Sequence, residues 1–290
     1  MTVGVATCGR PDGLDRCLRA LAAQTAPPAE VVVVDQAPSD AARAAVESSG
    51  LAAVRYLEQA RIGLAASRNL ALESARHDVL AVTDDDCVPD AGWLAAIETA
   101  FERSPHADAV TGPVLALGER PPGGHAISLR ESMTPVDHAG RKVPWNVGTG
   151  ANLAAPAALL RECGGWDVRL GTGSPGKAAE DADLLYRLLL HGAVVRYEPA
   201  AVVRHEWQTR ERRLSTRWSY GYGVGAMCGL WLGRRDAFAI RMGAAYCRHH
   251  ARELLRGVRH TDRSELAEHS RALAGVGPGL LYGLRASRRR

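Results

Sequence analysis

The first half of the chain alternates short apolar runs with amphipathic segments, and this pattern constrains the fold more than any other feature. The apolar runs, which predict strands, lie at Val3–Ala6, Val31–Val34, Val54–Leu57 and Val79–Thr83. Segments with helical spacing lie at Leu14–Leu21, Asp40–Ser48, Gly63–Ala75 and Gly92–Phe101. An unbroken β-branched run such as Val31–Val34 is typical of a parallel strand that is covered on both faces. The alternation therefore predicts an α/β fold, with a mostly parallel, Rossmann-like central sheet and flanking helices.

Charge is unevenly distributed along the chain, although the net charge is only +4. The segment from Arg204 to Arg290 contains 18 arginines and 7 acidic residues, a net charge of +11, so the remainder carries −7. We therefore divide the chain into an acidic α/β region, residues 1–206, and a basic helical extension, residues 207–290. The asymmetry indicates an anionic partner: a phosphorylated substrate, an anionic lipid or an acidic protein. Nucleic acid is not expected, because no aromatic stacking platform is interleaved with the arginines.

Cysteine usage and hydropathy favour a cytoplasmic protein. The six cysteines form no Cys-x-x-Cys pair and no metal-binding spacing, so we expect reduced thiols. Met1 leads directly into an apolar strand, so no secretory leader is expected. The longest uncharged stretch, Trp218–Gly233, is short and rich in glycine, which predicts no membrane-spanning helix. Membrane association through the basic extension stays open as an alternative.

Three carboxylates, Asp84, Asp85 and Asp86, follow the apolar run Val79–Thr83 directly. Adjacent carboxylates at the end of a buried strand are costly unless a positive group meets them. Oxygen ligands suit Mg²⁺ and Mn²⁺, which commonly bridge to phosphates, and open α/β sheets bind ligands at the carboxyl ends of their strands. Aspartate is also common in solvated turns. We favour a divalent metal site over a solvated turn.

Five segments in this order resemble family 2 glycosyltransferases of the GT-A fold: Val31–Asp35, Gly63–Asn69, Thr83–Asp86, Gly164–Asp167 and Glu180–Leu188. The resemblance covers residues 1–206. It implies an inverting, non-processive enzyme that moves one sugar from a nucleotide sugar to an acceptor hydroxyl with Mn²⁺ or Mg²⁺. The donor would carry UDP, dTDP or GDP. The acceptor would be a glycan, a natural product, a lipid or a peptide.

The resemblance also implies roles for individual residues. Asp181 would be the catalytic base, and Asp86 and His205 would bind the metal. The residues expected to contact the donor nucleotide are Thr7, Arg10, Asp35, Arg68, Asn69 and Asp84. The residues expected to contact the acceptor or the sugar are Trp166, Asn152 and Glu180.

Several of these residues have simpler interpretations. Asp35 could cap the following helix or close a turn, and Arg68 could pair with Glu73 on its own helix. The acids of Glu180–Asp183 are favoured at a helix N-terminus without any catalytic role. Trp166 could be a core aromatic. A single histidine at a strand end, such as His205, is usually not a metal ligand.

Two other functions compete with sugar transfer. A sugar-nucleotide pyrophosphorylase shares the Rossmann-like core, but Cys8–Gly13 is a poor version of its glycine-rich phosphate loop. A non-catalytic carbohydrate-binding scaffold would not need Asp84, Asp86 and Asp181 together. Gly171–Ala178 nearly matches a P-loop but ends in alanine where a hydroxyl is required, so we interpret it as a loop that closes over the substrate.

The extension carries two periodic patterns. Gly221, Gly225, Gly229 and Gly233 recur every four residues and would form one stripe on a helix. Each helical glycine costs about 1 kcal/mol relative to alanine, so the stripe predicts close packing, against the catalytic region or against a second subunit in a homodimer. The arginines that follow predict a basic helical surface, either solvated or in contact with an anionic surface: Arg241, Arg248, Arg252, Arg256, Arg259 and Arg263.

Overall fold

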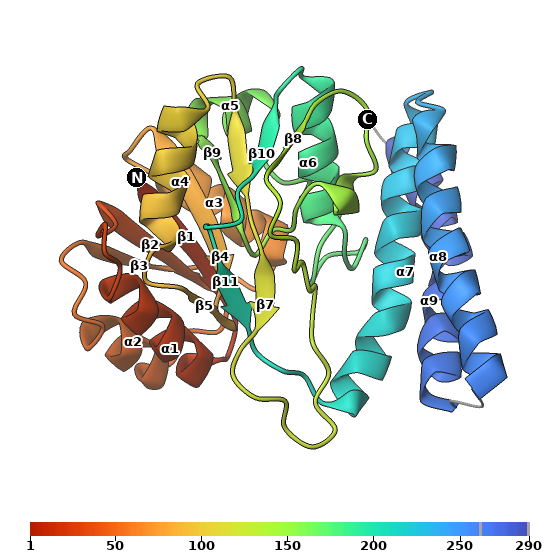
Figure 1. Ribbon diagram of the computed structural model, residues 1–290, viewed down its shortest axis with the longest axis horizontal. Helices are drawn as coiled ribbons and strands as arrows, with labels where there is room; N and C mark the ends of the chain where they lie inside the picture. Colours follow the sequence, from red (N-terminus) through yellow and green to blue (C-terminus); the bar gives the residue numbers. More distant parts are fainter. Residues whose placement is uncertain (261–262, 289–290) are drawn as a thin grey trace.

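The computed structural model describes residues 1–260 and 263–288, which form an α/β part and a helical extension (Figure 1). The central sheet has eight strands in the order β3-β2-β1-β4-β9-β6-β10-β8. Their bounds are β1 Thr2–Thr7, β2 Glu30–Asp35, β3 Val54–Glu58, β4 Val79–Asp84, β6 Ala109–Thr111, β8 Val136–His138, β9 Leu153–Pro156 and β10 Val195–Tyr197. Strands β1 to β4 are parallel, whereas β9 runs antiparallel to both β4 and β6. The predicted mostly parallel α/β fold is confirmed.

Helices cover both faces of this sheet, as the apolar pattern of β2 predicts. Val31 and Val33 pack in one hydrophobic cluster, and Val32 and Val34 pack in another, beneath α3. The helices of this part are α1 Pro11–Ala22, α2 Asp40–Glu47, α3 Leu64–Ser74, α4 Trp93–Arg103, α5 Ala157–Glu162 and α6 Glu180–Leu190, with a 3-10 turn at Pro144–Asn146. Both faces of β1, β2 and β4 are therefore dry in the middle of each strand, and the polar groups of these three strands lie near their ends.

A second sheet of three short strands lies beside the first and brings distant residues together. Its order is β5 (Cys87–Pro89), β11 (Val203–His205) and β7 (Val114–Ala116). β11 runs antiparallel to β5, and their register pairs His205 with Cys87. This pairing carries His205 to the acidic triplet, from which it is more than one hundred residues away in the sequence.

The extension consists, within the described residues, of α7 (Arg210–Gly233), α8 (Phe238–His260) and α9 (Arg263–Ser287). The glycine stripe of α7 packs against α9 of the same chain. A Cβ atom on Gly221, Gly225 or Gly229 would overlap a backbone carbonyl oxygen of α9. This corrects the expectation that the stripe packs on the catalytic region or on a second subunit.

A second glycine stripe completes this contact. Gly275, Gly279 and Gly283 of α9 face backbone carbonyls of α7 in the same way. The contacts advance in the same direction along both helices, so α7 and α9 are parallel and α8 connects them. Glycine lets two helix backbones approach this closely because it has no side chain to separate them.

None of the helices in the described residues has an apolar stretch long enough to cross a bilayer.

Candidate active site

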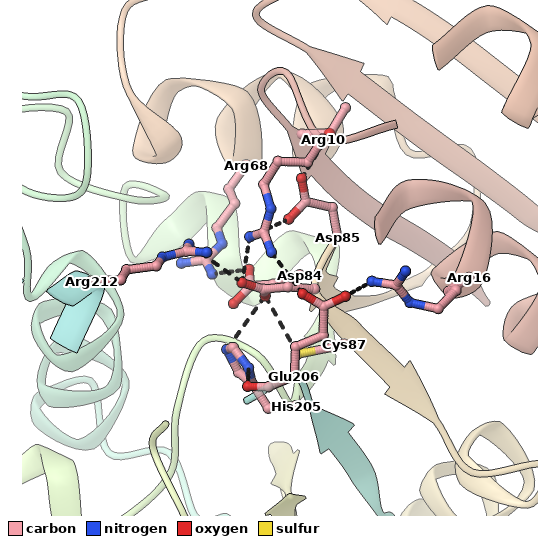
Figure 2. A network of polar contacts seen from close by, with 11 residues as sticks. Arg10, Arg16, Arg68, Asp84, Asp85, Cys87, His205, Glu206 and Arg212 are labelled. Carbon is pink, nitrogen blue, oxygen red and sulfur yellow. Dashed lines mark hydrogen bonds and ion pairs between the residues drawn. The ribbon is translucent and has the colours of Figure 1, made fainter. Parts of the chain in front are cut away.

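The polar groups of the site gather at the carboxyl edge of β1, β2 and β4, where the parallel strands end together. Asp84 is the last residue of β4, and Asp85 and Asp86 form the turn into β5. Figure 2 shows that arginines surround this turn on several sides. Arginines of the protein itself therefore offset part of the negative charge of the carboxylate cluster that the sequence predicts at this strand end.

The neighbouring carboxylates Asp85 and Asp86 have different surroundings. Asp85 is buried, accepts a hydrogen bond of 2.7 Å from the Thr7 hydroxyl, and lies 3.3 Å from the Arg10 guanidinium. Burial, together with the charge of Asp86, raises the pKa of Asp85 to about 6 despite Arg10. Asp86 receives a hydrogen bond of 2.5 Å from the same guanidinium. Thr7 and Arg10, which we expected at the donor nucleotide, thus contact the acids of the triplet.

His205 faces Asp86 with one ring nitrogen and the protein backbone with the other. Its Nε2 lies 3.4 Å from Asp86 Oδ1, and its Nδ1 lies 3.0 Å from the carbonyl oxygen of Glu206. A carbonyl oxygen can only accept, so Nδ1 carries the proton in this contact, and Nε2 is the ring nitrogen that faces the carboxylate. These two atoms attract each other only with a proton or a cation between them. A metal-binding histidine is commonly oriented in this way.

The ligand atoms of Asp86, Cys87 and His205 all lie within 4.8 Å of one another, and all three residues are buried. Burial by itself raises the pKa of Asp86, but His205 and Arg10 outweigh it and hold that pKa below its ordinary value. Burial raises the pKa of the Cys87 thiol well above its ordinary value. The carboxylate and the imidazole therefore fit a divalent cation such as Mn²⁺, and the thiol is the weaker donor.

Arg16, Glu206 and Arg212 also belong to this network and are not among the residues predicted from the sequence. Glu206 pairs with Arg10 at 3.0 Å and with Arg16 of α1. Arg212, in the first turn of α7, lies 3.8 Å from Asp86. The sequence offers only a weak signal for them, since Glu206 follows His205 directly and Arg212 lies in the basic extension.

A buried arginine connects Asp84 to the start of α6. Arg68 is 4% exposed and donates hydrogen bonds to Asp84 (2.7 Å) and to Glu180 (3.0 Å). It pairs across the site and not with Glu73 of its own helix. Burial lowers the pKa of Arg68, but the charges of Asp84 and Glu180 raise it above its ordinary value. Burial and the adjacent Asp181 raise the pKa of Glu180 to about 7.

Asp181 lies half-buried in the first turn of α6 with both carboxylate oxygens oriented. One oxygen accepts a hydrogen bond from the Gly150 amide (2.8 Å) and the other from the Ala182 amide (2.7 Å). The segment before it is strained, because Lys177 and Ala179 have φ values of 68° and 72°. Such left-handed non-glycine residues cost about 1–3 kcal/mol each and cluster at functional sites.

Asp35 and Asn69 have protein partners for their side chains. Asp35 is fully buried and accepts hydrogen bonds from the Ala37 amide (2.8 Å) and the Tyr56 hydroxyl (2.7 Å), as its interpretation as a turn residue predicts. Asn69 exchanges two hydrogen bonds with the backbone of Trp166, at 2.8 and 2.7 Å. Their contacts with a nucleotide remain predictions.

Two residues predicted to contact sugar or acceptor, Trp166 and Asn152, have side chains that lie in the core. Trp166 is 1% exposed and packs in the cluster between the sheet and α6. Asn152 is also 1% exposed, accepts a hydrogen bond from the Trp93 indole, and donates to the carbonyl oxygens of Pro113 and Ala201. Protein atoms enclose both side chains, so their role in this structure is packing and core hydrogen bonding.

Comparison with known proteins agrees with this geometry. Residues 2–156 match the model of glycosyl transferase family 2. The chain belongs to this family. A relative, the pre-mycofactocin glycosyltransferase of Mycobacterium tuberculosis, is 30% identical over 171 residues, which are 57% of this chain and 34% of the relative. The chain therefore matches about a third of that protein's length. Membership in a glycosyltransferase family removes the support for a pyrophosphorylase.

Solved structures show the same GT-A fold at low sequence identity. Residues 1–349 of TarS from S. aureus align with a TM-score of 0.65 and 17% identity, over 96% of this chain and 79% of TarS 1–349. The mannosyltransferase PcManGT from Pyrobaculum calidifontis, in complex with GDP-Man and Mn²⁺, aligns with a TM-score of 0.63 and 18% identity, over 98% of this chain and 86% of PcManGT. These alignments cover the helical extension as well as the family 2 segment.

Proposed function

We propose that this family 2 glycosyltransferase moves one sugar from a nucleoside-diphosphate donor to an acceptor hydroxyl, with inversion and with Asp181 as the base. The observation that carries the proposal is the position of Arg68. Its guanidinium bonds Asp84 at the end of β4 and Glu180 beside Asp181. One buried residue thus connects the acidic strand end, where a diphosphate would bind, with the helix that holds the base.

The donor site in this proposal lies at the edge of the sheet around Asp86 and His205, which would hold Mn²⁺ or Mg²⁺. When bound there, the cation would neutralise negative charge on the diphosphate leaving group. Arg10 and Arg212 already direct positive charge toward Asp86 and would contact the same phosphates. TarS in complex with UDP and PcManGT in complex with GDP-Man and Mn²⁺ support a nucleotide-sugar donor. UDP, dTDP and GDP all remain candidates for its nucleotide.

The chemical step requires one proton acceptor and one leaving group. Asp181 takes the proton of the acceptor hydroxyl as that oxygen forms a bond to the anomeric carbon of the sugar. The bond from the anomeric carbon to the diphosphate breaks, and its electron pair leaves with the phosphate oxygen. The amides of Gly150 and Ala182 fix the orientation of the carboxylate. A single displacement with one base inverts the anomeric centre.

The replacement Asp181→Asn tests the role of the base, because it keeps the shape of the side chain and removes its basicity. We expect kcat to fall by about 10²- to 10⁴-fold, while nucleotide binding is retained. Nucleotide binding is measured as the rise in melting temperature with UDP, dTDP or GDP, each with and without Mn²⁺. An Asp181→Asn enzyme with full turnover would remove this mechanism, and a retained anomeric configuration in the product would exclude inversion.

We propose the cellular compartment and the acceptor as broad classes. All six cysteines are free thiols, which supports action in a reducing compartment such as the cytoplasm. A glycan, a natural product, a lipid or a peptide hydroxyl would each suit a base in this position.

A further inference from the structure

One face of α8 is exposed along its whole length and combines arginines with apolar side chains. Helix α8 runs along the outer side of the extension (Figure 1). Residues of this face recur at spacings of three and four, so they share one side of the helix. They are Arg241, Ala244, Arg248, Ala251, Arg252, Leu255, Val258 and Arg259, and all are exposed. We call them the basic face. The opposite side of α8 is buried through Met242, His250 and Gly257.

The charge of this helix is strongly positive and largely uncompensated. Helix α8 contains five arginines and one acidic residue, Glu253. Glu253 pairs with Arg256, which borders the basic face. Within the described residues, Arg248, Arg252 and Arg259 of the basic face have no acidic partner. Their charges therefore point into solvent and attract an anion-rich surface.

The apolar side chains beside these arginines are unusually exposed. Leu255 is 62% exposed and Val258 is 59% exposed, and Ile240, one turn before Ala244, is 63% exposed. A face that is merely solvated needs no large apolar side chains, whereas a helix that lies at a membrane surface presents them next to Arg or Lys. The arginines bind lipid phosphates while the apolar side chains enter the boundary between headgroups and acyl chains.

We propose that the basic face docks the enzyme onto a phospholipid membrane that contains anionic lipid. A second copy of the chain is a poor occupant, because symmetric pairing would bring two rows of arginines together. Nucleic acid is also a poor occupant, because the basic face has no aromatic side chain for stacking bases. An acidic protein would satisfy the arginines but gives no reason for exposed Leu255 and Val258 to be part of the same face.

The test is flotation of the full-length protein with phosphatidylcholine vesicles that either contain or lack phosphatidylglycerol. We expect binding to the anionic vesicles that weakens as salt is added. Each arginine near an anionic surface contributes about a fivefold gain in affinity, so Arg248→Gln, Arg252→Gln and Arg259→Gln together should reduce the partition coefficient by about 100-fold. The double variant Leu255→Ser, Val258→Ser should also weaken binding, and its residual binding should disappear at high salt.

A matched control removes the same charge from the α/β part. The variant Arg19→Gln, Arg76→Gln, Arg103→Gln replaces three exposed arginines outside the extension and should bind anionic vesicles like the wild type. Equal losses in the two triple variants would overturn the proposal, because net charge alone would then explain binding. Wild-type protein that ignores anionic vesicles but binds heparin or DNA would overturn it in favour of another polyanion. Melting temperatures check that every variant is folded.

Discussion

The close contact between α7 and α9 makes a sharp prediction for the replacement Gly225→Ala. A Cβ atom at this position would overlap the carbonyl oxygen of Val276 and would lie 2.9 Å from the Leu280 nitrogen. Both are backbone atoms of a helix, so no side-chain rotation can relieve the overlap. The two helices must move apart, and the neighbouring glycine contacts loosen with them.

The expected change in the free energy of unfolding of Gly225→Ala is the sum of two opposing contributions. Alanine is the better helix former and by itself stabilises a helix by about 1 kcal/mol relative to glycine. Overpacking a tight contact costs about 1–3 kcal/mol, and we expect the upper end because the obstructing atoms are backbone. The net loss should be about 2 kcal/mol, which corresponds to a melting temperature lower by about 4–8 °C.

A glycine in α8 provides the matched control. A Cβ atom on Gly243 would meet nothing closer than the Cys228 sulfur at 3.7 Å, which is an ordinary van der Waals distance. Gly243→Ala should therefore gain stability, by up to about 1 kcal/mol. Thermal and urea unfolding, followed by circular dichroism, measure both variants. If Gly225→Ala proves as stable as Gly243→Ala, the close contact between α7 and α9 does not exist in solution.

Three further predictions concern the site and the core beneath it. The pKa of Glu180, about 7, lies above its ordinary value of 4.5, so the stability that its neutral form contributes is present below pH 4.5 and is lost as the pH rises to 7. The melting temperature of the wild type, measured relative to that of Glu180→Gln, should therefore fall between pH 4.5 and pH 7. Parallel curves of melting temperature against pH for the two proteins would contradict this prediction. Asn152→Leu should destabilise the protein by about 3 kcal/mol, because it leaves the buried Trp93 indole and the Ala201 carbonyl unpaired, whereas folded protein should still bind nucleotide. Asp86→Asn should abolish the Mn²⁺-dependent part of nucleotide-induced stabilisation, and an unchanged shift in calorimetry would place the metal elsewhere.

The local sequence pattern was sufficient to predict the sheet. It did not predict that the neighbouring carboxylates Asp85 and Asp86, at the edge of the sheet, differ in their surroundings and in the direction of their pKa shifts. The run Val31–Val34 predicts a strand with two dry faces because the signal, an unbroken β-branched run, lies within four adjacent residues. The different states of Asp85 and Asp86 depend on Thr7 and Arg10, which are far away in the sequence. Long-range pairs of this kind leave no periodic signal.

The same reasoning applies to the two predicted sugar or acceptor contacts whose side chains lie in the core. Asn152 and Trp166 are chemically able to bind a sugar, and both lie near motifs of the family. Their burial depends on partners such as the carbonyls of Pro113 and Ala201, which the sequence does not identify. A buried asparagine with three satisfied hydrogen bonds fixes the core around it and has little left to offer a ligand.

The glycine stripes are different, because here the signal was present in the sequence. The stripe at Gly221–Gly233 predicts a close contact but not its partner. A second stripe of the same period, at Gly275, Gly279 and Gly283, is visible in the same extension. Two stripes of equal period on neighbouring helices match each other, since each supplies the gap that the other's backbone needs.

The helical extension contacts residues of the candidate active site and helps to position them. Helix α7 brings Arg212 to within 3.8 Å of Asp86, and further along it Gly223 packs so closely on Ala178 that a Cβ atom there would lie 2.6 Å away. Ala178 precedes the strained Ala179 and the acids of α6, so the position of α7 bears on both the proposed metal site and the proposed base. The interleaved glycines fix α7 against α9 and thereby limit its movement. A contact that lies outside the family 2 segment can therefore set the geometry in which that segment works.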